Sequence, residues 1–345
     1  MRGGPASAQT RRQRWLAALA QVPPPSFSLV MATGIVSLGA QMMGWPWIAQ
    51  ALFALNVLQY ALLWLLYLLR ASLQPRLFFG DMVNHQRGPG YFTLVAGTGI
   101  LASQCVLLRG LVGAGWVLGI LAAGLWLVLT YAIFSAFAVK RDKPRLDEGI
   151  SGLWLLAVVA TQSLAVIATL LGEHADLRLQ PGLGLFSLSM WLCGGMLYML
   201  MMALIFYRWM FLRLEPGDLS PPYWINMGAM AISTLAGALL IEQSGHLPLL
   251  QALRPFLLGV TLLYWVTGSW WIPVLLVLGV WRHGMRRQPI RYDLQYWAMV
   301  FPLGMYAACT WKMGEAMGFG FLQELSYLVW WAALLAWVLT FAGML

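Results

Sequence analysis

Ten apolar stretches run through this chain, and short polar loops separate them. They cover residues 24–44, 47–69, 91–108, 112–139, 152–172, 183–207, 224–242, 255–281, 294–311 and 321–344. A helix needs about 20 apolar residues to cross the hydrocarbon core of a membrane. Only 10% of the residues are charged, against about 25% in soluble domains. The sequence therefore predicts an all-α integral membrane protein with ten transmembrane helices embedded in the lipid bilayer.

The positive charges are distributed unevenly between the two sides of these spans. Seventeen of the 21 lysines and arginines fall in the N-terminal segment or in the loops after the even-numbered spans. Because loops rich in Lys and Arg stay in the cytoplasm, we expect both termini to be cytoplasmic in a cell (inner) membrane. Residues 1–22 then form a basic cytoplasmic segment, and residues 23–345 form the membrane domain. The net charge of +9 reflects topology and gives no reason to expect a nucleic-acid partner.

One short motif occurs twice. The nine residues Phe27–Ile35 return as Phe92–Ile100 with six positions identical, and weaker echoes begin at Trp154, Trp224 and Trp297. The spacing fits five helical hairpins that enter the membrane from the same face, so that the odd-numbered helices form one equivalent set. That set is rich in small residues, whereas the even-numbered helices are bulkier. We expect five parallel hairpins around a central pore in each protomer, although small residues also occur where helices simply pack together.

The repeat places one residue of each inner helix at the same depth, four positions after its aromatic start. Phe301 is the only large ring at that level, and Pro302 behind it removes a helix hydrogen bond and is expected to kink the helix. Phe301 is either a hydrophobic plug or an ordinary packed ring. The other residues expected to line the pore are small, apolar or neutral: Met31, Thr33, Gly34, Ala96, Thr98, Gly99, Val158 and Gly228.

The densest polar cluster lies just before the third span and contains Asp81, His85 and Arg87. Either an Asp–Arg pair fixes this loop, or the loop forms a cytoplasmic vestibule in which Arg87 and His85 contact an anion. Histidine has an ordinary pKa near 6.5, so its charge could follow cytoplasmic pH. The three cysteines lie in different spans and the four histidines in loops. We therefore expect no metal site and no cofactor.

Four segments give the chain a resemblance to a known family: Val30–Ile35, Asp81–Tyr91, Thr267–Pro273 and Trp297–Pro302. They resemble the tellurite-resistance/C4-dicarboxylate transporter family, which includes slow-type anion channels, malate permeases and sulfite exporters. The resemblance extends over essentially the whole membrane domain. It implies a homotrimer in which each protomer has its own pore, lined by helices one, three, five, seven and nine. It also implies that a phenylalanine of helix nine closes the pore, which corresponds to Phe301 here.

The expected function is transport of small inorganic or organic anions, such as a dicarboxylate, sulfite, tellurite or nitrate, through a phenylalanine-gated pore. A proton-coupled C4-dicarboxylate carrier is the alternative within transport. A membrane-embedded enzyme using Asp81, His85 and Arg87 is the alternative from another class. We do not expect an enzyme, because no nucleophile with a paired base accompanies that cluster.

Overall fold

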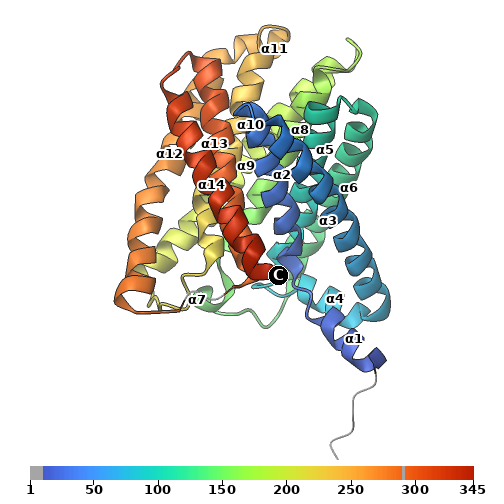
Figure 1. Ribbon diagram of the computed structural model, residues 1–345, viewed down its shortest axis with the longest axis vertical. Coiled ribbons are helices and arrows are strands. Elements are labelled where there is room, and N and C mark those ends of the chain that lie inside the picture. The colour runs from blue at the N-terminus through green and yellow to red at the C-terminus, as the bar shows by residue number, and fades with distance from the viewer. Residues whose placement is uncertain (1–10, 290–291) are drawn as a thin grey trace, which may run out of the picture.

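The computed structural model describes residues 11–289 and 292–345, and within them every regular element is a helix. Ten long helices run along the molecule (Figure 1). Five of them are mostly buried: α2 (Ser28–Met42), α5 (Phe92–Arg109), α8 (Leu156–Gly172), α10 (Ile225–Gln243) and α13 (Trp297–Met317). The other five are largely exposed: α3 (Pro46–Leu73), α6 (Val112–Val139), α9 (Gln180–Phe211), α12 (Arg254–Val280) and α14 (Leu322–Met344).

Nine helices in the described part of the chain are long and apolar enough to cross a membrane, which confirms a multi-span membrane protein. The exception among the ten is α13, whose last turns carry Lys312 and Glu315. This helix lies between α2 and α10 and packs on α14. A helix enclosed by other helices has little contact with lipid, so its sequence does not need to be uniformly apolar. The tenth span therefore stays a prediction.

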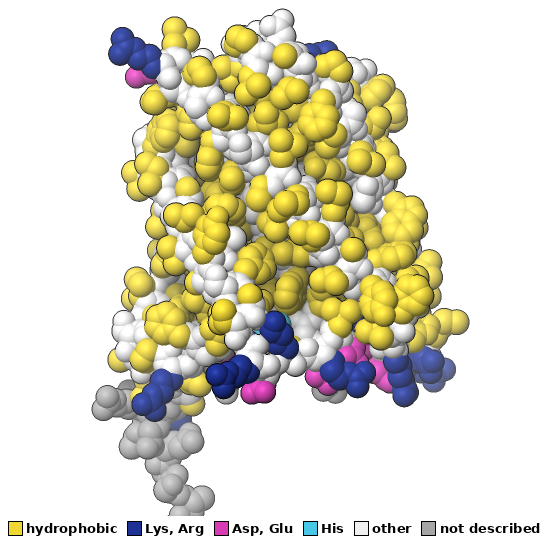
Figure 2. Space-filling model, turned by 180° about the vertical axis from the view of Figure 1, so that it is seen from behind, with side chains coloured by type: hydrophobic (Ala, Val, Ile, Leu, Met, Phe, Trp, Pro, Cys, Tyr) yellow, Lys and Arg dark blue, Asp and Glu magenta, His cyan; other side chains and the backbone are white. Residues whose placement is uncertain are grey.

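The five buried helices, which we call the inner helices, form a closed ring. Each contacts the next, in the order α2, α5, α8, α10, α13 and back to α2. Each outer helix packs on the inner helix that precedes it in the sequence. The most apolar part of the span Gly152–Gly172, which contains α8, is 100% buried, whereas that of the span Arg254–Met285, which contains α12, is only 17% buried. The small residues of the odd-numbered spans thus lie inside, and the bulky apolar residues of the even-numbered spans cover the outside (Figure 2).

All five inner helices begin at the same end of the molecule. A single 3₁₀ turn leads into each one: η1 (Pro24–Phe27), η2 (Gly88–Tyr91), η3 (Gly152–Leu155), η4 (Pro221–Trp224) and η6 (Leu294–Tyr296). Proline is frequent in these turns because its fixed φ suits the first turn of a helix. The short helices α1 (Arg11–Ala20), α4 (Pro75–Met82) and α7 (Leu146–Gly149) and the C-terminus lie at this end (Figure 1).

We call this the basic end, because most Lys and Arg side chains in view gather there (Figure 2). The opposite end, which includes α11 (Pro248–Ala252), is called the far end. The chain beyond α12 continues as a π turn, η5 (Trp281–Met285), at the basic end. The predicted basic segment 1–22 includes residues 1–10, which lie outside the described residues.

Aromatic residues at the start of the sequence repeat pack against rings of the outer helices. Each of three repeat positions meets a ring of the following helix edge-on or tilted, the geometry that aromatic pairs prefer. The ring centroids are 5.2 Å apart for Phe27 and Tyr67, 5.9 Å for Phe92 and Phe134, and 6.2 Å for Trp297 and Trp337. At three of the five repeat positions, the aromatic residue therefore forms a contact between an inner helix and the outer helix that follows it.

Candidate functional site

A cavity of about 260 Å³ opens inside the far-end half of the inner ring. Every inner helix contributes to its wall, for example through Ile35, Ser103, Val166, Leu235 and Met305. Most of the lining is aliphatic. We call this the far-end cavity, and its charged side chains come from the last turns of the helices or just after them: Glu173, Glu242 and Lys312.

A second cavity, of about 640 Å³, lies at the basic end. It is lined by the segments that lead into all five inner helices, including Pro24, Arg87, Ser151, Ser220 and Gln295. We call this the basic-end cavity. The partial positive charges of five helix N-termini lie close to it. Its charged side chains do not form a purely basic funnel, because two are arginines and four are acids: Arg87, Arg208, Asp147, Glu148, Asp218 and Asp293.

The helical spacing of α13 shows where Phe301 lies relative to the far-end cavity. In α13 the cavity is lined by Met305, Ala308 and Lys312. Phe301 is four residues before Met305 and therefore lies on the same face, one turn nearer the basic end. Its side chain is only 1% exposed. The ring is therefore buried on the side of α13 that lines the far-end cavity one turn further on.

The same rule places other predicted residues at this level. Met31, Ala96 and Gly228 each lie three or four residues before a residue that lines the far-end cavity, and all three are buried. Val158 is different, because it precedes Ser163 by five residues and so lies about 140° around the helix from it. Its neighbour Val159, also buried, is the residue of α8 that shares the face of Ser163.

Close packing surrounds Phe301. A Cβ atom added to Gly228 would lie 2.6 Å from Cγ of Pro302 and 3.2 Å from its Cα. Gly228 therefore lets α10 approach α13 closely at Pro302, the residue after Phe301. A Cβ on Gly304 would meet Ile35 of α2 at 2.8 Å. The α13 helix continues through Pro302 as one element, so the proline does not end it.

The remaining predicted lining residues fall into two groups. The Thr33 hydroxyl accepts a hydrogen bond from Trp337 Nε1 of α14 at 3.0 Å, and the Thr98 hydroxyl is bonded to the Tyr60 hydroxyl of α3 at 3.1 Å. Both point to outer helices. Gly34 packs against side chains of α3 and α5. Gly99, in contrast, lines the far-end cavity.

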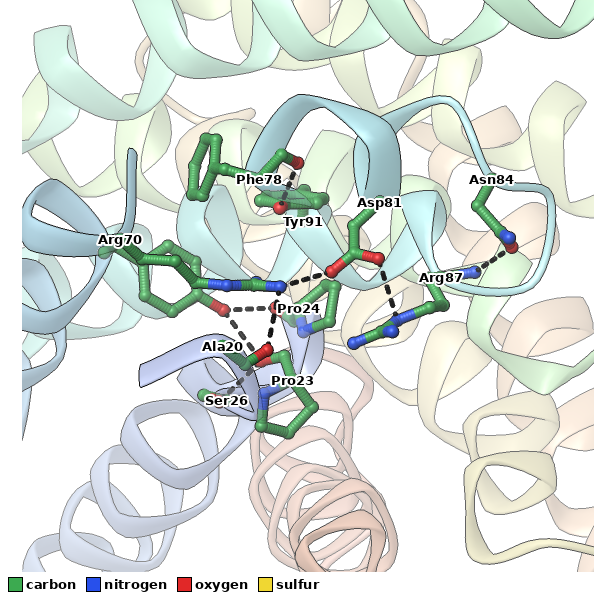
Figure 3. A network of polar contacts seen from close by, with 11 residues as sticks. Ala20, Pro23, Pro24, Ser26, Arg70, Phe78, Asp81, Asn84, Arg87 and Tyr91 are labelled. Atoms are coloured by element: carbon green, nitrogen blue, oxygen red, sulfur yellow. Dashed lines mark hydrogen bonds and ion pairs between the residues drawn. The ribbon is translucent and has the colours of Figure 1, made fainter. Parts of the chain in front are cut away.

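At the basic end, Asp81 connects two arginines (Figure 3). One carboxylate oxygen lies 2.5 Å from Nη2 of Arg70, and the other lies 3.2 Å from Nε of Arg87. Arg70 is 1% exposed at the end of α3 and also donates to the Ala20 carbonyl at 3.3 Å. Arg87 is 45% exposed and lines the basic-end cavity. Arg87 therefore both takes part in the Asp–Arg pair and lines the basic-end cavity.

His85 is not among the residues that line this cavity. Its ring stacks on Phe137 of α6 with centroids 4.2 Å apart, and its carbonyl accepts a hydrogen bond from Trp154. Burial, assisted by the nearby positive charges of Lys140 and Lys143, lowers the pKa of His85 below 6.5. The imidazole is consequently neutral at pH 7.

Arg70 has counterparts that reasoning from the sequence missed. Arg208, at the end of α9, lies 3.5 Å from Asp218 and donates to the Tyr223 hydroxyl at 2.5 Å. Arg282, after α12, donates to the Leu219 carbonyl. The sequence does carry a signal for this set, because an aspartate follows each arginine by ten or eleven residues: Arg70 and Asp81, Arg208 and Asp218, Arg282 and Asp293. Among the described contacts the first two of these form ion pairs, whereas Arg282 bonds to the Leu219 carbonyl.

The comparisons with known proteins agree with this architecture. The sequence profile of the voltage-dependent anion channel family (SLAC1) matches residues 21–345. A membrane protein of Mycobacterium tuberculosis is 36% identical over 149 residues, which are 43% of this chain and 75% of that protein. A transporter of Methanocaldococcus jannaschii is 22% identical over 91% of both chains. The sulfite efflux pump of Trichophyton rubrum is 26% identical over 96% of this chain and 92% of its own.

The profile match covers nearly the whole chain, and the relatives named for a function are transporters and sulfite pumps. The chain therefore belongs to the voltage-dependent anion channel family, which is the tellurite-resistance/dicarboxylate transporter family.

Proposed function

We propose that this protein is a permease for small anions. Its path runs along the axis of the inner ring, from the basic-end cavity to the far-end cavity, and five parallel hairpins build it. Phe301 closes the path between the two cavities. Two cavities at opposite ends of one five-helix ring, with a buried aromatic ring on the face between them, are the main support for this proposal.

The charge distribution of the inner helices suits an anion. Their acidic and basic residues, within the described chain, all lie in the last turns at the far end: Arg109, Glu242, Lys312 and Glu315. The middle of the path is consequently neutral. An anion crossing it meets no fixed negative charge, and small or apolar side chains set the width of the path.

Among the candidate anions, sulfite is the first to test. Relatives named as sulfite efflux pumps match the chain over nearly its full length. Nitrate, tellurite and a C4-dicarboxylate are the other substrates proposed from the family. The basic end is then cytoplasmic, and the protein forms a trimer with one path in each protomer.

Flux measurements with purified protein in liposomes test the function. Chloride, nitrate, sulfite and malate are offered in turn, with and without a pH gradient, and protein-free liposomes are the control. We expect protein-dependent sulfite or nitrate flux without a pH gradient, low in the wild-type protein and higher in the Phe301→Ala variant. Malate flux that requires the gradient would favour the coupled dicarboxylate carrier. Failure of all four anions to cross in both the wild-type protein and the Phe301→Ala variant would contradict a permease.

A further inference from the structure

Lys312 is the only basic side chain among the residues that line the far-end cavity. It lies in α13, on the same face as Phe301 and Met305, eleven residues after Phe301 and hence about three turns beyond it. Its side chain is 32% exposed. The ammonium group therefore lies at the rim of the cavity, where the proposed path opens to the far side.

The walls beneath Lys312 offer little to an anion. They are mainly aliphatic, with Leu38, Leu170 and Leu239 among the lining residues. The two serine hydroxyls of the lining donate to carbonyls of their own helices, Ser103 to Gly99 at 2.9 Å and Ser163 to Ala160 at 2.7 Å. Besides the serines and Lys312, only Gln41 among the lining residues has a side-chain donor; it is neutral and exposed at the end of α2. An anion in an apolar cavity with so few donors is strongly unfavourable. A neighbouring cation is the obvious compensation.

Two carboxylates already hold this cation, but not equally. The Lys312 ammonium lies 3.0 Å from Oε2 of Glu315 and 3.4 Å from Oε1 of Glu242. Glu315 is fixed further, because its other oxygen accepts a hydrogen bond from Trp311 at 2.9 Å. Glu242 has no such support in the described contacts, and it lines the cavity from α10. Glu242 is thus the more easily displaced partner.

We infer that Lys312 is the anion-binding group at the far mouth of the path, and that Glu242 competes with the transported anion for it. This inference rests on the proposed function. An ammonium group has three protons to donate, so Glu315 keeps its hydrogen bond while an anion replaces Glu242. The ligand class is a small oxyanion, whose oxygens take the place of the Glu242 carboxylate. Release to the far side follows when Glu242 returns to Lys312.

Single-sided conductance in planar bilayers tests this, with nitrate as the probe. Each variant carries the Phe301→Ala background so that the path conducts. We expect Lys312→Met to raise the half-saturating nitrate concentration about tenfold when nitrate is added at the far side, the change expected for loss of one charged hydrogen bond. Glu242→Gln should lower it severalfold. Arg178→Met is the matched control, because Arg178 is exposed at the same end and does not line the cavity; it should leave the concentration unchanged.

The outcomes separate this inference from the proposed function. If the Phe301→Ala background conducts nitrate but Lys312→Met leaves far-side half-saturation unchanged, Lys312 is not the binding group. The inference also fails if Lys312→Met and Arg178→Met have the same effect, or if Glu242→Gln raises the half-saturating concentration. Loss of conductance in the background protein itself would contradict the permease instead. Thermal unfolding of each variant is measured in parallel, so that a change in half-saturation caused by partial unfolding can be recognised.

Discussion

Asp81 lies where two arginines from different parts of the chain meet, and both of its carboxylate oxygens are engaged. Arg70 comes from the end of α3 and is almost fully buried, whereas Arg87 leads into α5 and is half exposed. The first contact therefore stabilises the fold, and the second leaves a guanidinium at the basic-end cavity. With both oxygens bound to arginines, Asp81 is poorly placed to act as a general base.

Arg70→Ala should destabilise the protein strongly. The substitution removes the buried cation from one oxygen of Asp81 and the donor from the Ala20 carbonyl, and Asp81 keeps only Arg87. Loss of a hydrogen bond to a charged group costs about 1.5–3 kcal/mol. Thermal unfolding of the purified protein in detergent measures the effect. Arg213→Ala is the matched control, because Arg213 forms an ion pair with Glu215 at 2.8 Å but is 89% exposed; such surface pairs contribute about 0–1 kcal/mol. Equal losses in the two variants would show that burial of Arg70 has no special role.

Arg87→Ala should lower anion flux severalfold, because it removes one of the two arginines that line the basic-end cavity. Arg76→Ala provides the comparison, since Arg76 is exposed in α4 of the same connecting segment and is not among the residues that line the cavity. Flux into liposomes is measured at equal amounts of folded protein. If the two variants transport equally, Arg87 has no part in the path.

At the residue scale the sequence could indicate which side chains share a helix face, but not which face meets which neighbour. Thr33 and Thr98 are in the right helices, yet their hydroxyls bond to Trp337 and Tyr60 of outer helices. Val158 is in the right turn of α8, and the adjacent Val159 has the spacing of the cavity face. The buried role of Arg70 depends on a loop conformation that spacing alone does not predict.

The inner helices pack so closely that single atoms matter to them. Gly228→Ala should place its new methyl group against Pro302, where a Cβ would be 2.6 Å from Cγ. Overpacking of this kind costs about 1–3 kcal/mol, and it would push α10 away from α13. Gly124→Ala in α6 is the control, because no heavy atom lies within 4 Å of its added Cβ. We expect a lower melting temperature for the first variant and not for the second; the reverse order would contradict the packing described for α10 and α13.

At the scale of elements, the sequence predicted much of the architecture because membrane helices carry their own signals. Length and apolarity located the spans, and the repeated aromatic starts correspond to contacts between inner and outer helices. The short helices α4 and α7 were not predicted, since they are too short to show a periodic pattern. The α13 helix is less apolar than the other long helices. It is surrounded by protein, so few of its side chains need to be compatible with lipid.

At the scale of the whole molecule, the uneven distribution of charge predicts a cytoplasmic basic end. Arg145→Cys should react with a membrane-impermeant thiol reagent only from the cytoplasmic side, because Arg145 is 77% exposed in a loop at the basic end. Arg178→Cys, exposed at the far end, should react only from outside. Intact cells and inverted vesicles give the two sides. Labelling of Arg145→Cys from outside alone would reverse the proposed topology.

A path that Phe301 closes between the two cavities is the central feature of the proposed function, and conductance of the Phe301→Ala variant tests it most directly. Phe27→Ala is the matched control, because Phe27 is also buried at the start of an inner helix but packs on α3. If Phe301 only packed, its loss would cost about 3–5 kcal/mol of stability without opening a path. We predict that Phe301→Ala raises anion conductance severalfold over wild type in folded protein, that Phe301→Leu raises it less, and that Phe27→Ala does not raise it. A stable Phe301→Ala protein that conducts no better than wild type would contradict the account.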